Sequence, residues 1–500
     1  MNQPERSVHL QLSKTGGPPF NGSVGYVNDR IAPLLRARGW QVRALAPPRP
    51  RQPTAQESMV PMALARALAD QSSGGTPMLA LHDGAGASIR VPSRQWARHH
   101  LVLYHGLAYG TGAWIGNDAI DLHCANSPYL ARTLRALFAT PDWLARRVLD
   151  PVGLARVVDV PMPVPCVSAP AGETGFSTGA EIPATVRRAL DAGIVLGHAL
   201  QPAKQDLVAT VGILFCLNDA ARRSGGDRVM LAISEQSLPP VHQASIDAML
   251  AGTGLRCADL FLPVPHLRHR AVFELFRLAR FGLAYNRFPE PFGFYVLESV
   301  HAGCPVFTNG VGNNRFLLPD GHGITVIEDG SMIADATGHV SPAAFLPVAR
   351  AIREGIQDCE ATRRACELGR ARIAAGWSPA AFEDGLLASV ERALEPPAPP
   401  VGFDALQVGL GPLVRGLDPV SGVLRCDYAN RVLAAHEVSI VQGLVGRSAV
   451  DVDAADMHRL EAEHRFFEEG VLALCTPDAV RAGSAGSPAA RTSGTGRTPA

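Results

Sequence analysis

The sequence predicts an α/β protein with two doubly wound domains of parallel strands, followed by a smaller module. An apolar run over residues 8–12 leads into a glycine-rich loop, a helical stretch over residues 24–38 and a second apolar run over residues 41–46. This order of strand, loop, helix and strand is typical of the opening unit of a parallel sheet. A comparable strand begins at Ile194, and a chain of 500 residues has room for two or three domains.

The remaining elements of the two domains follow in order along the chain. The first domain continues with short buried strands at residues 79–82 and 101–104 and is expected to end in a strand over residues 157–164. Small and polar residues then predict a linker. The second domain opens with a strand at 194–198, and its further elements are strands at 229–233 and 259–262, helices at 240–251 and 269–280, and a closing helix at 379–394.

A third region follows the proline-rich segment Pro397-Ala398-Pro399-Pro400, which is typical of a stiff linker. Helical stretches at residues 429–443 and 454–470 predict a small, mostly helical module, and a winged-helix-like arrangement is one expected form. The last segment lacks core-forming residues, which predicts disorder. The predicted boundaries are 1–167 for the first domain, 168–187 for a linker, 188–396 for the second domain, 397–403 for the proline-rich linker, 404–480 for the module and 481–500 for the tail.

The composition excludes several classes of partner. The formal net charge is +0, which argues against binding nucleic acid or an anionic membrane by bulk electrostatics. No apolar run reaches the length of a membrane span, and the polar first residues, with Glu5 among them, do not form a secretory signal. The 9 cysteines are scattered, which favours free thiols and a cytoplasmic location.

The most informative segment runs from Arg287 to Val306, where Glu290 and Glu298 lie eight residues apart around a predicted helix start. The flanking prolines hold Glu290 in extended backbone, and Gly293 allows close approach of a ligand to the backbone. A short helix over residues 294–302 then ends at Gly303. Free N–H groups at a helix start suit a phosphate, and flanking carboxylates suit hydroxyl groups.

This segment resembles the donor-sugar motif of retaining GT-B glycosyltransferases of family 4, which include glycogen-synthase-like and mannosyltransferase enzymes. The pattern is Glu, seven residues, Glu, with Pro-Phe-Gly after the first acid and Gly-x-Pro-Val after the second, and every position is filled. Ser299 and His301 depart from the pattern, because the family usually has alanine there. The resemblance covers roughly the first four-fifths of the chain. It implies a GT-B fold, with two Rossmann-like domains facing a cleft, an N-terminal acceptor domain and a C-terminal donor domain.

The resemblance also implies roles for individual residues. Glu290 would accept hydrogen bonds from the transferred sugar, and Glu298 from the nucleotide ribose. Lys204 and His198 would neutralise the leaving diphosphate, although the family has arginine where this chain has His198. The implied catalytic residues are His105, His198, Lys204 and Glu290, and the implied donor-binding residues are Gly17, Gly197, Phe292, Gly293, Phe294, Leu297, Glu298, Gly310 and Gly312. Both histidines could instead be ordinary structural residues at strand ends.

The predicted function is a retaining, metal-independent glycosyl transfer from a nucleotide-diphosphate sugar to an unidentified sugar, small-molecule or protein acceptor. The sugar nucleotide is a co-substrate, and the pattern implies no cofactor. One alternative is a non-catalytic GT-B-like protein that binds a nucleotide sugar or a partner. A sugar-nucleotide epimerase or a phosphorylase is a weaker alternative. Residues 404–480 are candidates for recognising the acceptor or a partner, since they lie outside the region with the donor motif.

Overall fold

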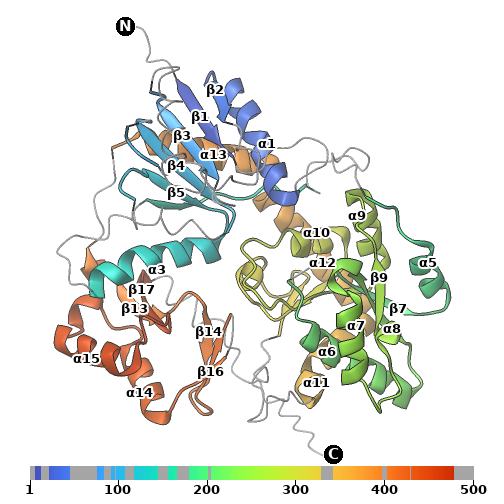
Figure 1. Cartoon of the computed structure of the whole chain (residues 1–500). Helices are drawn as coiled ribbons and strands as arrows, with labels where there is room; N and C mark the ends of the chain where they lie inside the picture. The colour runs from blue at the N-terminus through green and yellow to red at the C-terminus, as the bar shows by residue number, and fades with distance from the viewer. Residues whose placement is uncertain are drawn as a thin grey trace, which may run out of the picture. The chain divides into compact units, whose positions relative to one another are not determined.

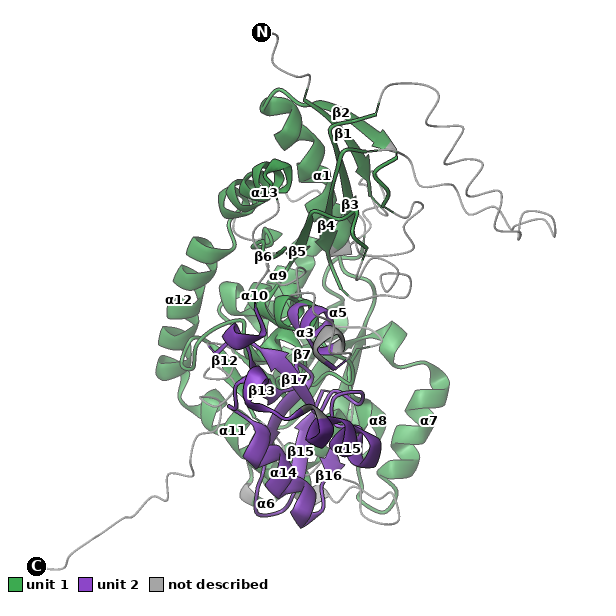
Figure 2. Ribbon diagram, turned by 90° about the vertical axis from the view of Figure 1, so that its left-hand side faces the viewer, with its two compact units in different colours: residues 1–134, 156–398 green, residues 135–155, 399–500 purple. Residues whose placement is uncertain are grey.

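The structure is a computed structural model that describes residues 6–12, 22–45, 76–83, 92–95, 97–106, 117–144, 156–165, 179–200, 204–327, 342–396, 402–427 and 430–477. The chain divides into two compact units, which Figure 2 shows in green and purple. Unit 1 comprises residues 1–134 and 156–398, and unit 2 comprises residues 135–155 and 399–500.

Unit 1 contains two six-stranded parallel sheets, which confirms the predicted pair of doubly wound domains (Figure 1). The first sheet has the strand order β2-β1-β3-β4-β5-β6. Its strands are β1 (Ser7–Gln11), β2 (Gln41–Leu45), β3 (Leu79–Asp83), β4 (His99–Tyr104), β5 (Leu122–Ala125) and β6 (Val157–Asp159). The expected strand over residues 157–164 is therefore shorter than predicted, since β6 ends at Asp159.

The second sheet has the order β12-β11-β10-β7-β8-β9, so the strand order reverses between β7 and β10. Its strands are β7 (Val195–Ala199), β8 (Val229–Ser234), β9 (Phe261–Val264), β10 (Phe281–Ala284), β11 (Val306–Thr308) and β12 (Ile324–Val326). In parallel sheets ligands bind at such a reversal, beyond the carboxyl ends of the strands. The strand expected over residues 259–262 begins later, because Asp259 belongs to the short helix α8 (Cys257–Leu260).

The helices of unit 1 begin and end where side-chain chemistry favours it. Asp206 accepts a hydrogen bond from the Ala209 N–H at the start of α6, and Gly225 ends that helix with a φ of 67°. The helices are α1 (Gly22–Ala37), α3 (Pro128–Leu144), α5 (Ala184–Asp191), α6 (Leu207–Ser224), α7 (Pro240–Met249), α9 (His269–Leu278), α10 (Phe294–Ala302), α11 (Leu346–Gln357), α12 (Cys359–Gly376) and α13 (Pro379–Leu394). Short 3-10 turns lie at Glu235–Ser237 (η4) and Asn313–Arg315 (η5).

The closing helix α13 packs against the first sheet, although it follows the second sheet in sequence (Figure 1). Its buried Phe382, Leu386 and Val390 share a core with the strands β1, β3 and β4. Ser378 caps its first turn by accepting a hydrogen bond from the Ala381 N–H. The helix predicted at residues 379–394 is confirmed with the same bounds.

Unit 2 is a mixed α/β module. The two predicted helices are present as α14 (Ala435–Leu444) and α15 (Ala454–His464). The expectation of a mostly helical module is incomplete, because antiparallel strands also form. These strands are β13 (Gln407–Leu410) paired with β17 (Leu472–Cys475), and β14 (Val414–Leu417), β15 (Val423–Cys426) and β16 (Arg431–Val432) in a second sheet.

The core of unit 2 includes part of a helix that the sequence assigned to the first domain. Ala139 of α3 packs with Val441 of α14 and with Leu472 of β17. The Leu474 N–H donates a hydrogen bond to Thr140 Oγ1 at 3.0 Å. Residues 135–155 therefore belong with the C-terminal module, and the predicted start of that module at residue 404 omits them.

Several sequence predictions fall outside the described residues. They are Gly17, most of the linker at 168–187, much of the proline-rich segment at 397–403 and the tail at 481–500. Among the helices of the described part, none combines the length and apolar character needed to cross a bilayer.

Candidate functional site

Glu290 is held by a loop that follows β11. Its backbone forms a parallel bridge with Gly312, and the Asn313 N–H donates a hydrogen bond to the Glu290 carbonyl at 2.7 Å. Gly312 has a φ of 67°, and a Cβ atom there would overlap the backbone of Glu290. Glycine is therefore required at Gly312 both by its backbone conformation and by this close approach. The predicted role of Gly312 beside the sugar site is consistent with its position, although its packing explains the glycine without a ligand.

Glu290 forms an ion pair with the predicted diphosphate-binding lysine. The Lys204 Nζ atom donates to Glu290 Oε2 at 2.8 Å. The carboxylate side chain is only 7% exposed, whereas the lysine side chain is 41% exposed. A buried carboxylate needs such a partner, and an exposed ammonium group can still reach a ligand. The structure thus brings together two predicted catalytic residues that are 86 positions apart.

Glu298, the second acid of the motif, also has a basic partner. His269 Nε2 lies 3.1 Å from Glu298 Oε1, and both side chains are largely buried. His269 is the first residue of α9, just beyond the loop after β9. Sequence reasoning missed His269, because no short motif marks it and the chain has 16 histidines. Its only signal was its place after a strand of the donor domain.

Helix α10 starts as predicted, between the two acids. Gly293 is its N-cap residue with a φ of 105°, and Gly303 ends it with a φ of 96°. A Cβ atom on Gly293 would lie 2.8 Å from Leu317 Cδ1, so a side chain is excluded by packing as well as by conformation. The first N–H groups of a helix carry a partial positive charge that favours a phosphate. A phosphate contact at this helix start stays a prediction.

The other side chains predicted to bind the donor are mostly packed in the interior. Leu297 is 0% exposed within the hydrophobic core, and Phe292 is 3% exposed. The ring of Phe294 lies 4.5 Å from the Phe292 ring and packs against the same core. The side chains of Leu297 and Phe292 stabilise α10 against the sheet, and Phe294 is partly buried beside them, so donor contact at these three positions stays a prediction.

Two predicted glycines also have packing reasons. A Cβ atom on Gly197 would overlap the Phe281 ring, and one on Gly310 would lie 2.7 Å from Val326 Cγ1. Gly310 also has a φ of 70°, which a side chain would strain. The Arg315 guanidinium donates to the carbonyls of Gly310 and Gly312 at 3.1 and 3.0 Å, and so fixes this loop. Arg315 is a second functional candidate that sequence reasoning missed.

His198 does not agree with its predicted role as a cation. It is 0% exposed on β7, and its two ring nitrogens lie 2.9 Å from the hydroxyls of Tyr295 and Ser299. Burial lowers the pKa of His198 from 6.5 to about 3, so the ring is neutral near pH 7. The expected charge on this imidazole is therefore corrected to an uncharged, structural residue. Its partner Ser299 also differs from the family pattern, so the two residues that differ from the pattern contact each other.

His105 lies beyond the end of β4 in a polar chain of residues. The Asn28 amide nitrogen donates to Asp83 Oδ2 at 2.6 Å, and His105 Nε2 lies 3.2 Å from Asn28 Oδ1. A carboxylate only accepts hydrogen bonds, so the amide must direct its nitrogen towards Asp83 and its oxygen towards His105. His105 Nε2 is consequently the protonated nitrogen. Asn28 and Asp83 are further residues that the sequence did not single out.

The strand ends of the first sheet contact the donor motif within unit 1. Ser127 Oγ, which follows β5, donates to the Pro291 carbonyl at 2.6 Å. A Cβ atom on Gly106 would lie 3.3 Å from Pro291 Cγ, so the loop after β4 is also adjacent. Pro291 directly follows Glu290, and Gly106 directly follows His105. The residues that follow His105 and Glu290 in the chain therefore lie close to each other.

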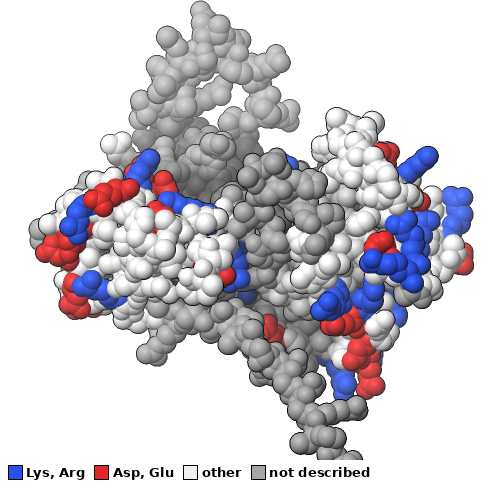
Figure 3. All heavy atoms as spheres, turned by 90° about the horizontal axis from the view of Figure 1, so that it is seen from below, with Lys and Arg blue, Asp and Glu red and all other residues white. Residues whose placement is uncertain are grey.

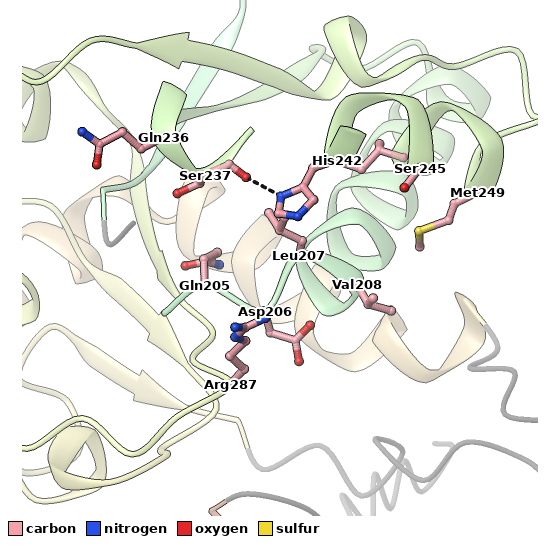
Figure 4. Close-up of a pocket in the computed structure, with 11 residues that line it drawn as sticks. Gln205, Asp206, Leu207, Val208, Gln236, Ser237, His242, Ser245, Met249 and Arg287 are labelled. Atoms are coloured by element: carbon pink, nitrogen blue, oxygen red, sulfur yellow. Dashed lines mark hydrogen bonds between the residues drawn. The ribbon is translucent and has the colours of Figure 1, made fainter. Parts of the chain in front are cut away.

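A cavity of about 590 Å³ lies at the carboxyl ends of strands of the second sheet, between α6, α7 and the loops after β7, β8 and β10 (Figure 4). His242 and Met249 of α7 line one wall, and Gln205, Asp206 and Arg287 line the opposite part. Arg287 is the first residue of the segment that resembles the donor motif, whereas neither Glu290 nor Glu298 lines the cavity. In the described part of the chain, no three His, Cys, Asp or Glu side chains gather as a metal site.

Charged side chains of both signs mix on the face of the molecule drawn in Figure 3. Among the described residues, partly exposed charged side chains form ion pairs, such as Arg223 with Asp219 and Arg228 with Asp259, both at 2.7 Å. Exposed pairs of this kind contribute little to stability.

Comparison with known proteins supports the fold. No protein-family model and no curated protein sequence matches the chain. Among solved structures, the α,α-trehalose-phosphate synthase (UDP-forming) from Burkholderia vietnamiensis is 12% identical with a TM-score of 0.52, and the match covers 78% of this chain and 99% of that chain. A glycosyltransferase from Rickettsia africae ESF-5 is 11% identical with a TM-score of 0.51, covering 79% of this chain and 100% of that chain.

A third solved structure with a similar fold is named as part of a phosphatase. The N-terminal domain of trehalose-6-phosphate phosphatase from Candida albicans is 10% identical with a TM-score of 0.51, covering 78% of this chain and 97% of that chain. The two parallel sheets and these likenesses together show that the chain has the GT-B fold. Identities this low show the fold alone.

Proposed function

We propose that this protein is a retaining glycosyltransferase that takes a glycosyl group from a nucleotide-diphosphate sugar. The observation that carries the proposal is the pair of motif carboxylates on either side of the α10 start, each held by a basic partner. Lys204 pairs with Glu290 at one end, and His269 pairs with Glu298 at the other. Such an arrangement suits a ligand with hydroxyl groups at both ends and phosphates in between.

In the proposed mechanism Glu298 accepts hydrogen bonds from the ribose hydroxyls, and Glu290 accepts them from the transferred sugar. The bond between the anomeric carbon and the diphosphate oxygen breaks, and negative charge develops on the diphosphate. Lys204 Nζ and the N–H groups at the start of α10 stabilise that charge, which is the main way an enzyme can accelerate this step. The acceptor hydroxyl then bonds to the same face of the anomeric carbon, and its proton passes to the leaving diphosphate oxygen on that face.

Lys204 would have to exchange partners during this cycle. In the structure its ammonium group contacts Glu290, and it would move to, or be shared with, the donor diphosphate. Its side chain has room to do so because it is 41% exposed. A fixed cation and a helix start can stabilise the leaving group, so the proposed mechanism requires neither a metal ion nor a cofactor.

His105 is proposed to contact the sugar or the acceptor from the first sheet. Asn28 fixes its protonated nitrogen, and Gly106 places its loop beside Pro291 of the donor motif. Loops of the first domain at residues 47–56 and 109–117 are the candidates for contacting the acceptor, and they lie almost wholly outside the described residues. A cytoplasmic location is proposed from the buried thiols, for example Cys124 and Cys304.

A non-catalytic protein that binds a nucleotide sugar is the second candidate. The neutral state of His198 favours it, because one of the two cations expected at the diphosphate is missing. The two candidates differ in one property, since only the enzyme forms a nucleotide diphosphate from the donor.

Unit 2 is proposed to recognise the acceptor or a partner. Its acidic stretch is a weak argument, because several of these groups serve local structure. Asp453 caps α15, Glu461 accepts from the Phe467 N–H, and Glu468 pairs with Arg465. Truncation after Leu394 would also leave residues 135–144 of α3 without the core in which Ala139 packs. Surface substitutions in unit 2 are therefore the better test.

The proposed function is tested by incubating the full chain with a panel of nucleotide sugars and a cell-extract acceptor pool. Mass spectrometry would detect glycosylated products, and UDP-sugars come first because one similar structure is a UDP-forming synthase. We expect transfer from at least one donor and its loss in Glu290→Gln. The matched control is Glu274→Gln on α9, whose carboxylate is exposed and lies outside the motif. Tight donor binding without any product would favour the non-catalytic candidate.

A further inference from the structure

The cavity between α6 and α7 contains buried polar atoms that lack partners. Gln205 and Ser237 both line it and are 5% and 7% exposed. Gln205 Oε1 and Ser237 Oγ have no hydrogen-bond partner within the described part of the chain. Leaving such an atom unsatisfied costs about 1–3 kcal/mol, so each calls for a ligand or water.

The orientation of the Gln205 amide is determined by its neighbours. Thr210 Oγ1 donates to the Asp206 carbonyl at 2.6 Å and accepts from Gln205 Nε2 at 2.7 Å. The amide nitrogen is thus already used, and the oxygen is the atom without a partner. A ligand at Gln205 must therefore offer a hydrogen-bond donor such as a hydroxyl group.

Arg287 adds a positive charge at the cavity. Among the described residues its guanidinium group forms no ion pair, and it lies 4.5 Å from the ring of the exposed Phe288. His242 uses Nδ1 for the Ser237 carbonyl at 3.2 Å, and its Nε2 has no partner among the described residues. These groups favour an anion near Arg287. Asp206 also lines the cavity, and it favours hydroxyl groups because one of its oxygens already caps α6.

The rest of the cavity wall is apolar. Leu207 and Val208 of α6 and Met249 of α7 line the space that Figure 4 shows, and Ile246 of α7 also lines the cavity. Apolar walls accept the C–H face of a sugar ring, and the cavity volume of about 590 Å³ lies within the range of small-molecule sites.

We propose that this cavity is a second ligand site, distinct from the paired acids Glu290 and Glu298, that binds a phosphorylated sugar. The phosphate would lie at Arg287, and the ring hydroxyls would satisfy Gln205 Oε1 and Ser237 Oγ. The same chemistry occurs in a free sugar phosphate and in the ribose phosphate of a nucleotide. The site is connected to the donor motif, because the Arg287 N–H donates to the Lys204 carbonyl at 2.9 Å and Gln205 directly follows Lys204.

Calorimetric titration of the full chain tests this site without any need for glycosyl transfer. The probes are glucose 1-phosphate, AMP, glucose and inorganic phosphate at constant ionic strength. We expect glucose 1-phosphate or AMP to bind at least tenfold more tightly than glucose or phosphate alone. Whichever of the two binds more tightly identifies the source as a free sugar phosphate or a nucleotide.

Three variants locate the binding. Arg287→Ala removes the cation, and Met249→Trp fills the cavity from an exposed position on α7, so each should weaken binding at least tenfold. Arg223→Ala is the control, because this exposed arginine lies at the other end of α6. Circular dichroism melts verify that the variants fold. The proposal is overturned if neither phosphorylated probe binds the wild type, or if both cavity variants bind it as tightly as the control does.

Discussion

The two parallel sheets of unit 1 have the same general architecture but place their ionisable side chains differently. In the second sheet, the motif acids near the strand ends each contact a base, as in Glu290 with Lys204 and Glu298 with His269. In the first sheet, histidines are buried on the strands themselves. His82, His100 and His123 lie on β3, β4 and β5 and are at most 2% exposed. The second sheet has one comparable residue, His198.

The comparison distinguishes charged side chains that are suited to bind a ligand from buried polar side chains that stabilise the packing of the sheet. The buried histidines satisfy each other or a neighbour, as in the contact of 3.1 Å between His82 and His100 and that of 3.0 Å between Tyr104 and His123. Burial lowers the pKa of His123 to about 3 and that of His100 to about 4. Such neutral rings carry no positive charge to offset that of an anion. The second sheet therefore has the better-supported ligand site, and its charged pairs are the groups to change first.

The largest effect is expected for Lys204→Met. Removing a preorganised charge from a developing anion typically costs about 2.7–4 kcal/mol, so turnover should fall roughly 10²- to 10³-fold. The measurement is the steady-state rate of nucleotide diphosphate release. Lys204→Arg keeps the charge and should recover part of the rate. A Lys204→Met enzyme that retains the wild-type rate would assign this lysine to structure.

Glu298→Gln should weaken donor binding more than turnover. A charge-assisted hydrogen bond contributes about 1.5–3 kcal/mol, so the dissociation constant should rise roughly 10- to 100-fold. Calorimetry with the nucleoside diphosphate measures it, and Glu274→Gln is the exposed control. An unchanged dissociation constant would show that the pair with His269 only stabilises the fold.

The buried histidines should make the protein less stable in acid. Above pH 6.5 each is neutral in both the folded and the unfolded chain. As the pH falls from 6.5 towards 3, only the unfolded chain takes up the proton, so stability is lost across that window. At pH 5 the loss is about 2 kcal/mol for His198 and a similar amount for His123, at 1.36 kcal/mol per pH unit.

Urea unfolding at pH 8 and pH 5 measures this loss. His198→Gln should reduce the difference between the two midpoints, because it removes one titrating group. His458→Gln, an exposed histidine in unit 2, is the control. If His198→Gln shows the full wild-type difference, the ring does not resist protonation in the folded chain.

The smallest effect is expected for Asn28→Leu in the first sheet. The substitution removes the hydrogen bond to His105, which is worth about 1 kcal/mol, so turnover should fall roughly fivefold with little change in donor binding. Steady-state kinetics separates the two quantities, and Asp29→Asn on the exposed side of α1 is the control. A change confined to thermal stability would make Asn28 a structural residue only.

The sequence predicted features whose residues lie close together along the chain. It missed contacts that form only when distant segments fold together. The helix α10, its glycine ends and both acids lie within one segment, so their order along the chain was sufficient. His269 meets Glu298 across 29 positions, and Asn28 meets His105 across 77, with no local pattern to indicate either contact. The share of α3 in unit 2 depends on packing between segments about 330 positions apart, such as Thr140 and Leu474.

The error on His198 could have been reduced from the sequence. His198 and Ser299 both depart from the family pattern, and the structure places them 2.9 Å apart. A histidine ring nitrogen and a serine hydroxyl can form a hydrogen bond with each other. Their joint presence therefore favours a contact between His198 and Ser299 over the view that His198 takes the place of the arginine. The depth of burial that lowers the pKa of His198 could not be predicted, because it depends on Phe276 and Tyr295 packing around the ring.

The central claim, that this site transfers a glycosyl group with retention, is tested most directly by the first product of donor hydrolysis. Full-length protein is mixed with an α-linked nucleotide sugar, and proton NMR follows the anomeric signal before mutarotation equilibrates it. The account predicts that the α-anomer and the nucleotide diphosphate form together, and that both are lost in Glu290→Gln. Initial release of the β-anomer would contradict retention, and the absence of nucleotide diphosphate with every donor tried would contradict glycosyl transfer itself.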